Sequence, residues 1–223
     1  MGAIRPISVI VVLTPRQRSA GTGSREEGGA MAVRFEFDAE KAIAVVCQIA
    51  SARLPGLTKG KICKLIFLAD RLHLVRYGRP ITGDDLCAME HGPVPSKTLN
   101  LLSAFELEAD DPNVGRLAQF VALDRRFLYP HFQSIREPEM ESLSPSDLKV
   151  LDEVIRDHGG KTFKELRALT HDFEAYKKAW EARTSNREFM RFEDLFEDED
   201  PDAIDGAKEE MLENSLLREA FTA

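Results

Sequence analysis

Three ionisable side chains recur at regular spacing in one apolar stretch of the sequence. Asp70, His73 and Arg76 follow one another at intervals of three residues, which places them on one face if the stretch is helical. A histidine beside an acid and a base can transfer a proton or bind a ligand. The same groups can instead form a ladder of ion pairs and hydrogen bonds that holds the next loop, because buried charges need partners. The sequence leaves both interpretations open.

Two sets of possible metal ligands lie nearby. One is the acidic set Asp84, Asp85 and Glu90, and the other is the thiol pair Cys63 and Cys87. His91 could join either set. Carboxylates with a histidine can hold the divalent ion of a hydrolase, and thiols with a histidine can hold zinc. The acidic residues, however, surround a predicted turn and short strand, where charged residues are common, and the thiols lack CxxC spacing. We therefore expect no metal site.

Other catalytic patterns are missing from the sequence. Ser96 is not surrounded by the Gly-x-Ser-x-Gly elbow of a serine hydrolase, and Gly56, Gly60 and Gly78 are too scattered for a phosphate-binding loop. We therefore expect no catalytic residues and no cofactor. The protein is predicted not to be an enzyme.

One long helix must position the first group of residues. Residues 59–77 form the longest strongly apolar segment, Thr58 can cap its start, and Gly78 with Pro80 can end it. Apolar side chains occupy nearly the whole circumference of this helix, which is typical of a helix packed on several sides. We predict that it is the central helix of the fold.

Short motifs in and after this helix resemble the signature of the Panacea domain family, which includes SocA-like antitoxins and phage-associated GepA-like proteins. The helix contains Leu-Ala-Asp at residues 68–70, and Gly-Pro-Val follows at residues 92–94. The resemblance covers about residues 38–185 and implies an antitoxin that binds a protein, without catalytic residues. The residues assigned to the family motif or to its structural support are Lys64, Leu65, Ala69, Asp70, His73, Gly78, Pro80, Gly92, Pro93 and Val94.

The remaining patterns predict a mainly α fold, a single-domain helical bundle with a small antiparallel β element. Helices are expected at 39–53, from Ser96 onward, at 145–158, from residue 163, and around Trp180. Residues 86–90 suggest an irregular or edge strand, 91–95 a rigid loop, and 117–123 with 126–131 a β-hairpin. Ser96, Ser144 and Thr162 are the expected helix caps.

Charge is distributed unevenly along the chain of 223 residues, whose net charge is −8. Residues 191–215 contain eleven acidic and two basic residues, whereas residues 53–80 contain seven basic residues and one acidic residue. We divide the chain into an extension at 1–35, a Panacea-like helical domain at 36–190, and an acidic tail at 191–223. In the tail, 193–205 indicate a solvated linker before a short helix that either docks on the core or folds on a partner.

The N-terminal extension is expected to be disordered, and Met31 is a possible true start. Its apolar run at residues 7–13 is too short to span a bilayer, and no convincing signal-peptide cleavage site follows. Three cysteines are too few for a secreted disulfide framework and indicate buried free thiols. We predict a cytoplasmic protein with no membrane partner.

A DNA partner is the main alternative for function. Residues 144–169 can form a helix, a turn and a second helix, with Lys161, Lys164 and Arg167 placed to contact phosphates. Acidic residues dilute this charge, and no obvious set of residues reads bases. We therefore expect two packed core helices, and binding of the protein to its own operator is kept as the alternative.

The sequence and the resemblance together predict an antitoxin of a toxin–antitoxin system that neutralises a cognate toxin by direct binding. A variant of this function is an adaptor that delivers the toxin to a cytoplasmic protease. The alternative is a DNA-binding regulator of its own operon, or a phage-associated regulatory protein. Positive charge and a proline-fixed loop make Arg71, Arg76, Arg79 and His91 the candidate partner-binding residues.

Overall fold

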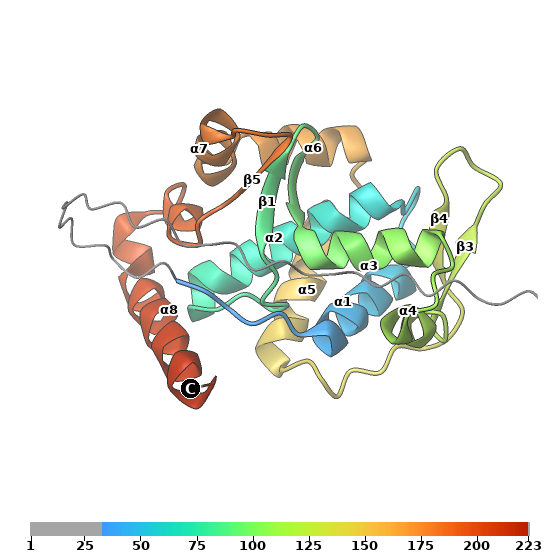
Figure 1. Cartoon of the computed structure of the whole chain (residues 1–223), viewed down its shortest axis with the longest axis horizontal. Coiled ribbons are helices and arrows are strands. Elements are labelled where there is room, and N and C mark those ends of the chain that lie inside the picture. The colour runs from blue at the N-terminus through green and yellow to red at the C-terminus, as the bar shows by residue number, and fades with distance from the viewer. Residues whose placement is uncertain (1–32, 223) are drawn as a thin grey trace, which may run out of the picture. The chain divides into compact units, whose positions relative to one another are not determined.

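The computed structural model describes residues 33–222, which belong to one compact unit. Helices dominate this part of the chain (Figure 1). They are α1 (Ala39–Ser51), α2 (Lys59–Tyr77), α3 (Ser96–Glu106), α4 (Pro112–Leu117), α5 (Pro145–His158), α6 (Phe163–His171), α7 (Glu174–Ala182), the 3-10 helix η1 (Glu193–Phe196) and α8 (Pro201–Thr222).

Five short strands in the described residues complete the fold. They form an antiparallel sheet in the order β2-β1-β5 and a separate antiparallel pair, β3-β4. The prediction of a mainly α fold with a small antiparallel β element is therefore confirmed. The strands are β1 (Leu86–Met89), β2 (Gly92–Pro95), β3 (Val121–Asp124), β4 (His131–Ser134) and β5 (Arg187–Phe189).

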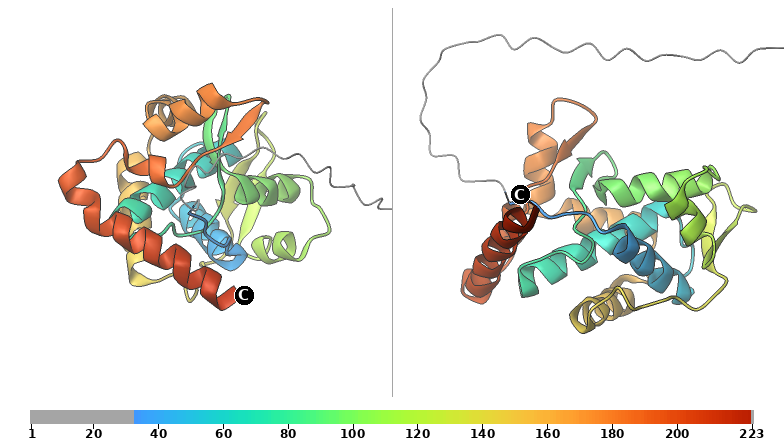
Figure 2. Two further views of the ribbon diagram at one scale, coloured as in Figure 1. Left: turned by 60° about the vertical axis from the view of Figure 1, so that its left-hand side comes forward. Right: turned by 60° about the horizontal axis from the view of Figure 1, so that its bottom comes forward.

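Helix α2 is the central element, as its apolar circumference predicts. It contacts α1, α3, α5, α6, α8, η1 and β2, and most of its side chains are buried. The Thr58 side chain accepts a hydrogen bond from the backbone N–H of Lys61 at its start, and Gly78 takes a left-handed conformation at its end. In Figures 1 and 2, α8 lies at one side of the molecule and α3 and α4 at another, with α2 between them.

The segment around the Gly-Pro-Val motif differs from the prediction. The sequence favours a loop at residues 91–95, but residues 92–95 form β2, and β1 is the middle strand of its sheet rather than an edge. Pro93 and Pro95 lack backbone N–H donors. They therefore fit a strand only where no further strand would accept hydrogen bonds from those positions. Strand β2 lies at an edge of the sheet, which satisfies this condition.

The cap of α3 also differs from the prediction. Ser96 is the first helical residue and makes no capping hydrogen bond with its side chain. The carboxylate of Asp84 instead accepts hydrogen bonds from the backbone N–H groups of Lys97 at 2.9 Å and Thr98 at 2.7 Å. A residue twelve positions upstream therefore caps the helix, and a search for a local cap could not find it.

The predicted starts of α5 and α6 are confirmed. Ser144 and Thr162 each form a capping box with the acidic residue three positions later. The predicted hairpin is present as β3 and β4, although its strands lie a few residues later than expected. Helix α4 follows the acidic stretch at 108–111 and is not among the predicted helices.

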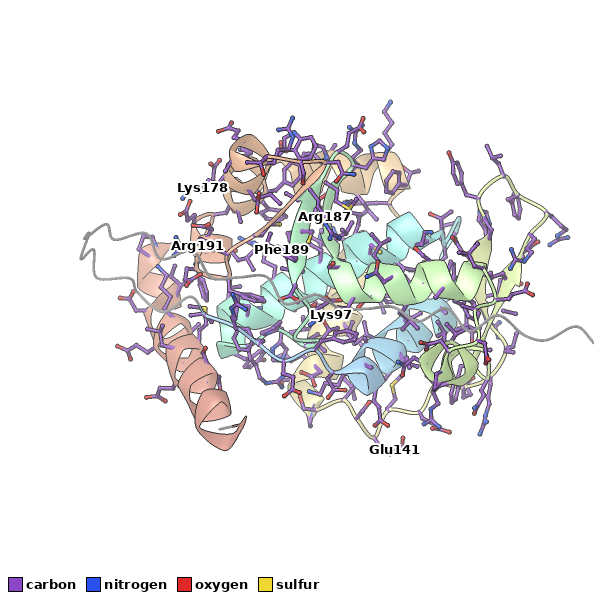
Figure 3. All side chains as sticks on the ribbon, in the orientation of Figure 1. Lys97, Glu141, Lys178, Arg187, Phe189 and Arg191 are labelled. Carbon is purple, nitrogen blue, oxygen red and sulfur yellow. The ribbon has the colours of Figure 1, made fainter. Side chains whose placement is uncertain are left out.

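The segments that flank the predicted helical domain pack against the core. Val33 and Phe35 are buried, so the boundary predicted at residue 35 falls inside a packed segment. The expectations for residues 1–32 lie outside the described residues. The prediction of a solvated linker at 193–205 is wrong, because Leu195 and Phe196 of η1 are buried. Two of the acids that suggested solvation form ion pairs instead. Lys178 of α7, labelled in Figure 3, contacts Asp194 at 3.6 Å and also Glu197.

The sequence left open whether the C-terminal helix docks on the core, and the structure shows that it does. Ile204, Ala207 and Met211 of α8 are buried at helical spacing, and α8 contacts α2. Among residues 33–222, no helix is both long enough and apolar enough to cross a membrane.

The close approach of α8 to Gly78 gives a first testable prediction. A Cβ atom on Gly78 would lie 2.5 Å from Cβ of Glu210 and 2.6 Å from the backbone nitrogen of Met211. Gly78→Ala should therefore lower the free energy of unfolding by about 2–4 kcal/mol, through the left-handed conformation and the displacement of α8. Urea denaturation measures this change.

Gly56→Ala is the matched control for this prediction. Gly56 has nearly the same φ, +60° against +64°, but a Cβ atom there meets nothing within 4 Å. This control should cost only the conformational strain, about 1 kcal/mol. Equal losses in the two variants would mean that α8 does not press on Gly78.

Candidate functional site

The motif residues of α2 face in several directions. Leu65 and Ala69 are buried in the hydrophobic core. Lys64 is only 1% exposed, and its ammonium donates a hydrogen bond of 2.6 Å to the carbonyl oxygen of Pro93 on β2. The lysine of the first motif therefore holds the Gly-Pro-Val segment of the second, although 29 residues separate them.

Asp70 holds the loop that follows α2. Its Oδ1 accepts hydrogen bonds from the backbone N–H groups of Ile81 and Thr82, both at 2.9 Å, and its Oδ2 accepts one from the Thr82 hydroxyl at 2.5 Å. Burial raises the pKa of Asp70 to about 7, although these hydrogen bonds oppose the shift. The interpretation that Asp70 secures the next loop agrees with these contacts.

His73 links the same loop to α5. Its Nδ1 lies 2.7 Å from the carbonyl oxygen of Arg79, and its Nε2 lies 3.1 Å from both the Ser146 hydroxyl and Oδ1 of Asp147. Nδ1 must carry a proton to bond the carbonyl, and the side chain is fully buried. These contacts fit the structural interpretation of His73 better than proton transfer to a substrate.

Asp147 contacts polar groups from more residues than any motif residue on α2 does. Its carboxylate contacts Lys41 at 3.1 Å, His73 at 3.1 Å and Arg79 at 2.9 Å, and it accepts a hydrogen bond from the backbone N–H of Ser144. Burial opposes ionisation of this carboxyl, but the His73 hydrogen bond, the Ser144 N–H and the nearby cations hold its pKa well below its usual range.

The Gly-Pro-Val segment packs tightly against α2 and α6. Gly92 has φ +93°, and a Cβ atom there would lie 2.8 Å from the His171 ring and 2.9 Å from Nζ of Lys64. Only glycine fits this position without moving these side chains. Pro93 and Pro80 are buried, and Val94 is half-buried at the surface of β2.

The four candidate partner-binding residues do not form one surface. Arg71 is 6% exposed; its guanidinium lies 2.8 Å from Glu199 and stacks over the Phe173 ring. Arg76 is exposed and forms a two-pronged ion pair with Glu153 of α5. Arg71 therefore contacts the acidic segment of its own chain, and partner binding by Arg76 stays a prediction.

The other two candidates differ in exposure and in their surroundings. Arg79 is half-buried, with its guanidinium on Asp147 and on the Ser144 hydroxyl. His91 is exposed at the turn between β1 and β2, in the lining of a cavity that also includes Lys64. Partner binding by these residues also stays a prediction, and His91 has the more accessible side chain of the two.

The acidic and thiol sets do not converge. Asp84 is buried at the start of α3, where it acts as the cap, and Asp85 forms an ion pair with Lys97. In the described part of the chain, no group of three or more His, Cys, Asp or Glu side chains is arranged to hold a metal ion. Burial raises the pKa of Cys63 to about 12, so this thiol stays protonated at neutral pH.

The helix pair considered for DNA binding also makes internal contacts. The Lys161 ammonium donates to the carbonyl oxygen of Asp157, and the Arg167 guanidinium donates to that of Glu90 at 3.3 Å. Lys164 is exposed. Two of the three cations proposed to contact phosphates are therefore already held by backbone oxygens.

The arrangement as a whole is a set of buried polar contacts that fixes backbone segments around one helix. It resembles no reacting constellation, and it connects residues that two separate motifs contribute. Comparison with protein families supports this grouping: residues 62–181 match the family described as antitoxin SocA-like, Panacea domain. The match covers more than half of the chain, and the protein belongs to this family. Comparisons with curated proteins and with solved structures gave no significant match.

Proposed function

We propose that this protein is an antitoxin that neutralises a cognate toxin by binding it directly, and that it acts in the cytoplasm without catalytic activity of its own. Membership of the SocA-like antitoxin family carries the proposal. The geometry supports it, because the motif side chains hold the loop at 79–82 and strand β2 in place. Segments fixed in this way lose little conformational entropy when they bind a partner.

The first test is genetic. Each open reading frame adjacent to the gene should be expressed alone and together with this protein. We expect one of them to arrest growth alone and to be tolerated in the presence of the protein. A copy of the gene with an early stop codon is the matched control, since it keeps the RNA and removes the protein.

The second test is biochemical and separates the mechanisms. Direct neutralisation predicts a stoichiometric complex of the two purified proteins and an unchanged level of toxin in rescued cells. An adaptor predicts that the toxin level falls and that rescue requires a protease. If the protein does not restore growth to cells expressing either neighbouring open reading frame, and the purified protein binds its own promoter, the regulator hypothesis replaces ours.

A further inference from the structure

A cavity of about 340 Å³ lies where β1 and β2 meet α2 and α7. Most of its wall is apolar, and Lys64 and Gly92 of the two family motifs also line it. The volume lies at the lower end of the range for ligand pockets, roughly 300–1,000 Å³. The half-buried apolar side chains in the wall are Met89, Val94, Leu99, Phe163 and Trp180.

Lys64 brings an incompletely bonded ammonium to this wall. An ammonium has three N–H donors, and Pro93 O is the single acceptor that Lys64 has among residues 33–222. Burial, with a smaller contribution from Arg167, lowers its pKa from 10.5 to about 7. A buried cation in this state gains stability from any acceptor that reaches it.

Two further polar atoms without a hydrogen-bond partner belong to helix α6, which packs on β2 beside Lys64. The Nε2 atom of His171 and the Nε atom of Arg167 are buried and have no hydrogen-bond partner in the described chain. Nζ of Lys64 and Nε2 of His171 lie 2.9 Å and 3.0 Å from the same point, the place where a Cβ of Gly92 would stand. Within residues 33–222, no Asp or Glu forms an ion pair with any of the three.

We propose that this cavity binds an apolar carboxylate, supplied by an acidic segment of the partner protein, with the carboxylate at Lys64 and the apolar group against Trp180 and Phe163. The identity of the partner rests on the antitoxin function proposed above. The site joins the incompletely bonded ammonium of Lys64 to an apolar wall, and a carboxylate on an apolar body matches both. The anion would accept the hydrogen bonds that the Lys64 ammonium leaves unmade.

The surroundings favour a single carboxylate over a polyphosphate. Glu90 also lines the cavity, and the chain has a net charge of −8. Both disfavour a highly charged backbone such as that of a nucleic acid. An apolar wall adds nothing to the binding of a free phosphate, but it stabilises the hydrocarbon part of a peptide side chain.

Trp180 makes the proposal directly measurable, because it is the single tryptophan of the sequence and it lines the cavity. The probe is 3-phenylpropionate, titrated into the purified full chain while tryptophan fluorescence is recorded. We expect saturable binding with a Kd on the order of 1 mM, as suits a ligand of this size. The neutral amide of the same acid should bind at least about tenfold more weakly.

Two results would overturn the assignment at this stage. One is the lack of any saturable response to 3-phenylpropionate. The other is a response to inorganic phosphate with equal affinity, which would show a simple anion site that makes no use of the apolar wall.

Lys64→Met tests the lysine, and Lys61→Met is its matched control. Both lysines belong to α2, both are 1% exposed, and Lys61 also donates to a backbone carbonyl, that of Pro55 at 2.7 Å. Lys61 does not line the cavity. Lys64→Met should weaken binding of the probe about tenfold or more, and Lys61→Met should leave it unchanged. Equal affinities in the two variants would contradict the proposal.

A pH titration of the unmodified chain keeps the test valid if Lys64→Met fails to fold. Binding should strengthen as pH falls from 9 to 7, because Lys64 gains its proton in this range. The titratable groups beside Lys64 contribute little to this change, because burial raises the pKa of Cys63 to about 12 and lowers the pKa of His171 below its ordinary value of 6.5. His91→Gln repeats the titration without the histidine that lines the cavity. A flat profile would remove Lys64 from the site.

The test of partner binding is done in cells, with the toxin found in the rescue experiment. Lys61→Met should still rescue growth, and Lys64→Met should not. If Lys64→Met rescues fully, the cavity is not where the partner binds, and this inference fails while the antitoxin function stands. If the unmodified chain restores growth against no neighbouring gene product, the antitoxin function fails. The fluorescence titration still decides whether the cavity binds a carboxylate.

Discussion

Asp147→Ala should lower the free energy of unfolding by about 3–5 kcal/mol, the usual cost of removing one partner from a buried group of charges. Asp147 is fully buried and contacts Lys41, His73 and Arg79, which come from three separate segments. Without it, the Arg79 guanidinium and the Lys41 ammonium keep their positions without a counter-charge. The N–H of Ser144 loses its acceptor as well, so the capping box of α5 opens.

Chemical denaturation at pH 7 measures this loss, and Asp152→Ala on the same helix is the control. Asp152 is exposed, and among the described residues its one hydrogen-bond partner is the Gln48 amide, at 3.3 Å. Its replacement should change stability by no more than about 0.5–1 kcal/mol. A loss at Asp147 as small as that at Asp152 would show that Lys41, His73 and Arg79 find other partners.

The same carboxylate gives the protein a dependence on acid. Its pKa is lower in the folded chain than in the unfolded chain, where it is near the ordinary 3.8. Stability from Asp147 is therefore present above about pH 4 and is lost as pH falls below that value. The unmodified chain should lose stability steeply below pH 4, and the slope should be smaller in Asp147→Ala.

The elements that the sequence predicts well are those whose causes are local. The span of α2 follows from an apolar run between Thr58 and Gly78, and the starts of α5 and α6 follow from capping boxes of four residues. The interpretation of the group on α2 as a support for the next loop also succeeds for Asp70 and His73. Each of these depends on residues that are near in the sequence.

The features that the sequence could not predict depend on contacts between distant residues. The sequence identifies Asp147 only as part of a capping box, although its main partners lie 68 to 106 residues away. Arg71 looks available in the sequence because its acidic partners belong to a segment expected to be solvated. Arg167 and His171 give no signal, since their shared surroundings exist only once α6 packs on Gly92. Motif spacing alone does not reveal which charges neutralise each other.

Asp70→Ala should lower the free energy of unfolding by about 3 kcal/mol, because it leaves two backbone N–H groups and a hydroxyl buried without acceptors. The N–H groups belong to Ile81 and Thr82, and both are inside the protein. For a chain of this size, the loss corresponds to a fall in Tm of roughly 6–12 °C. Differential scanning calorimetry measures it.

Asp70→Asn separates the hydrogen bonds from the charge. The amide oxygen can still accept from both N–H groups, and the amide nitrogen can donate to the Thr82 hydroxyl, so this variant should lose less than half as much as Asp70→Ala. Burial raises the pKa of Asp70 to about 7 in the folded state. The unmodified chain should therefore lose stability relative to Asp70→Asn as pH rises from about 4 to 7, opposite in sign to the effect of Asp147. Two results together would contradict this expectation: Asp70→Asn is as unstable as Asp70→Ala, and its stability difference from the unmodified chain does not shrink as pH rises. They would show that the loop at 81–82 requires an ionised carboxylate.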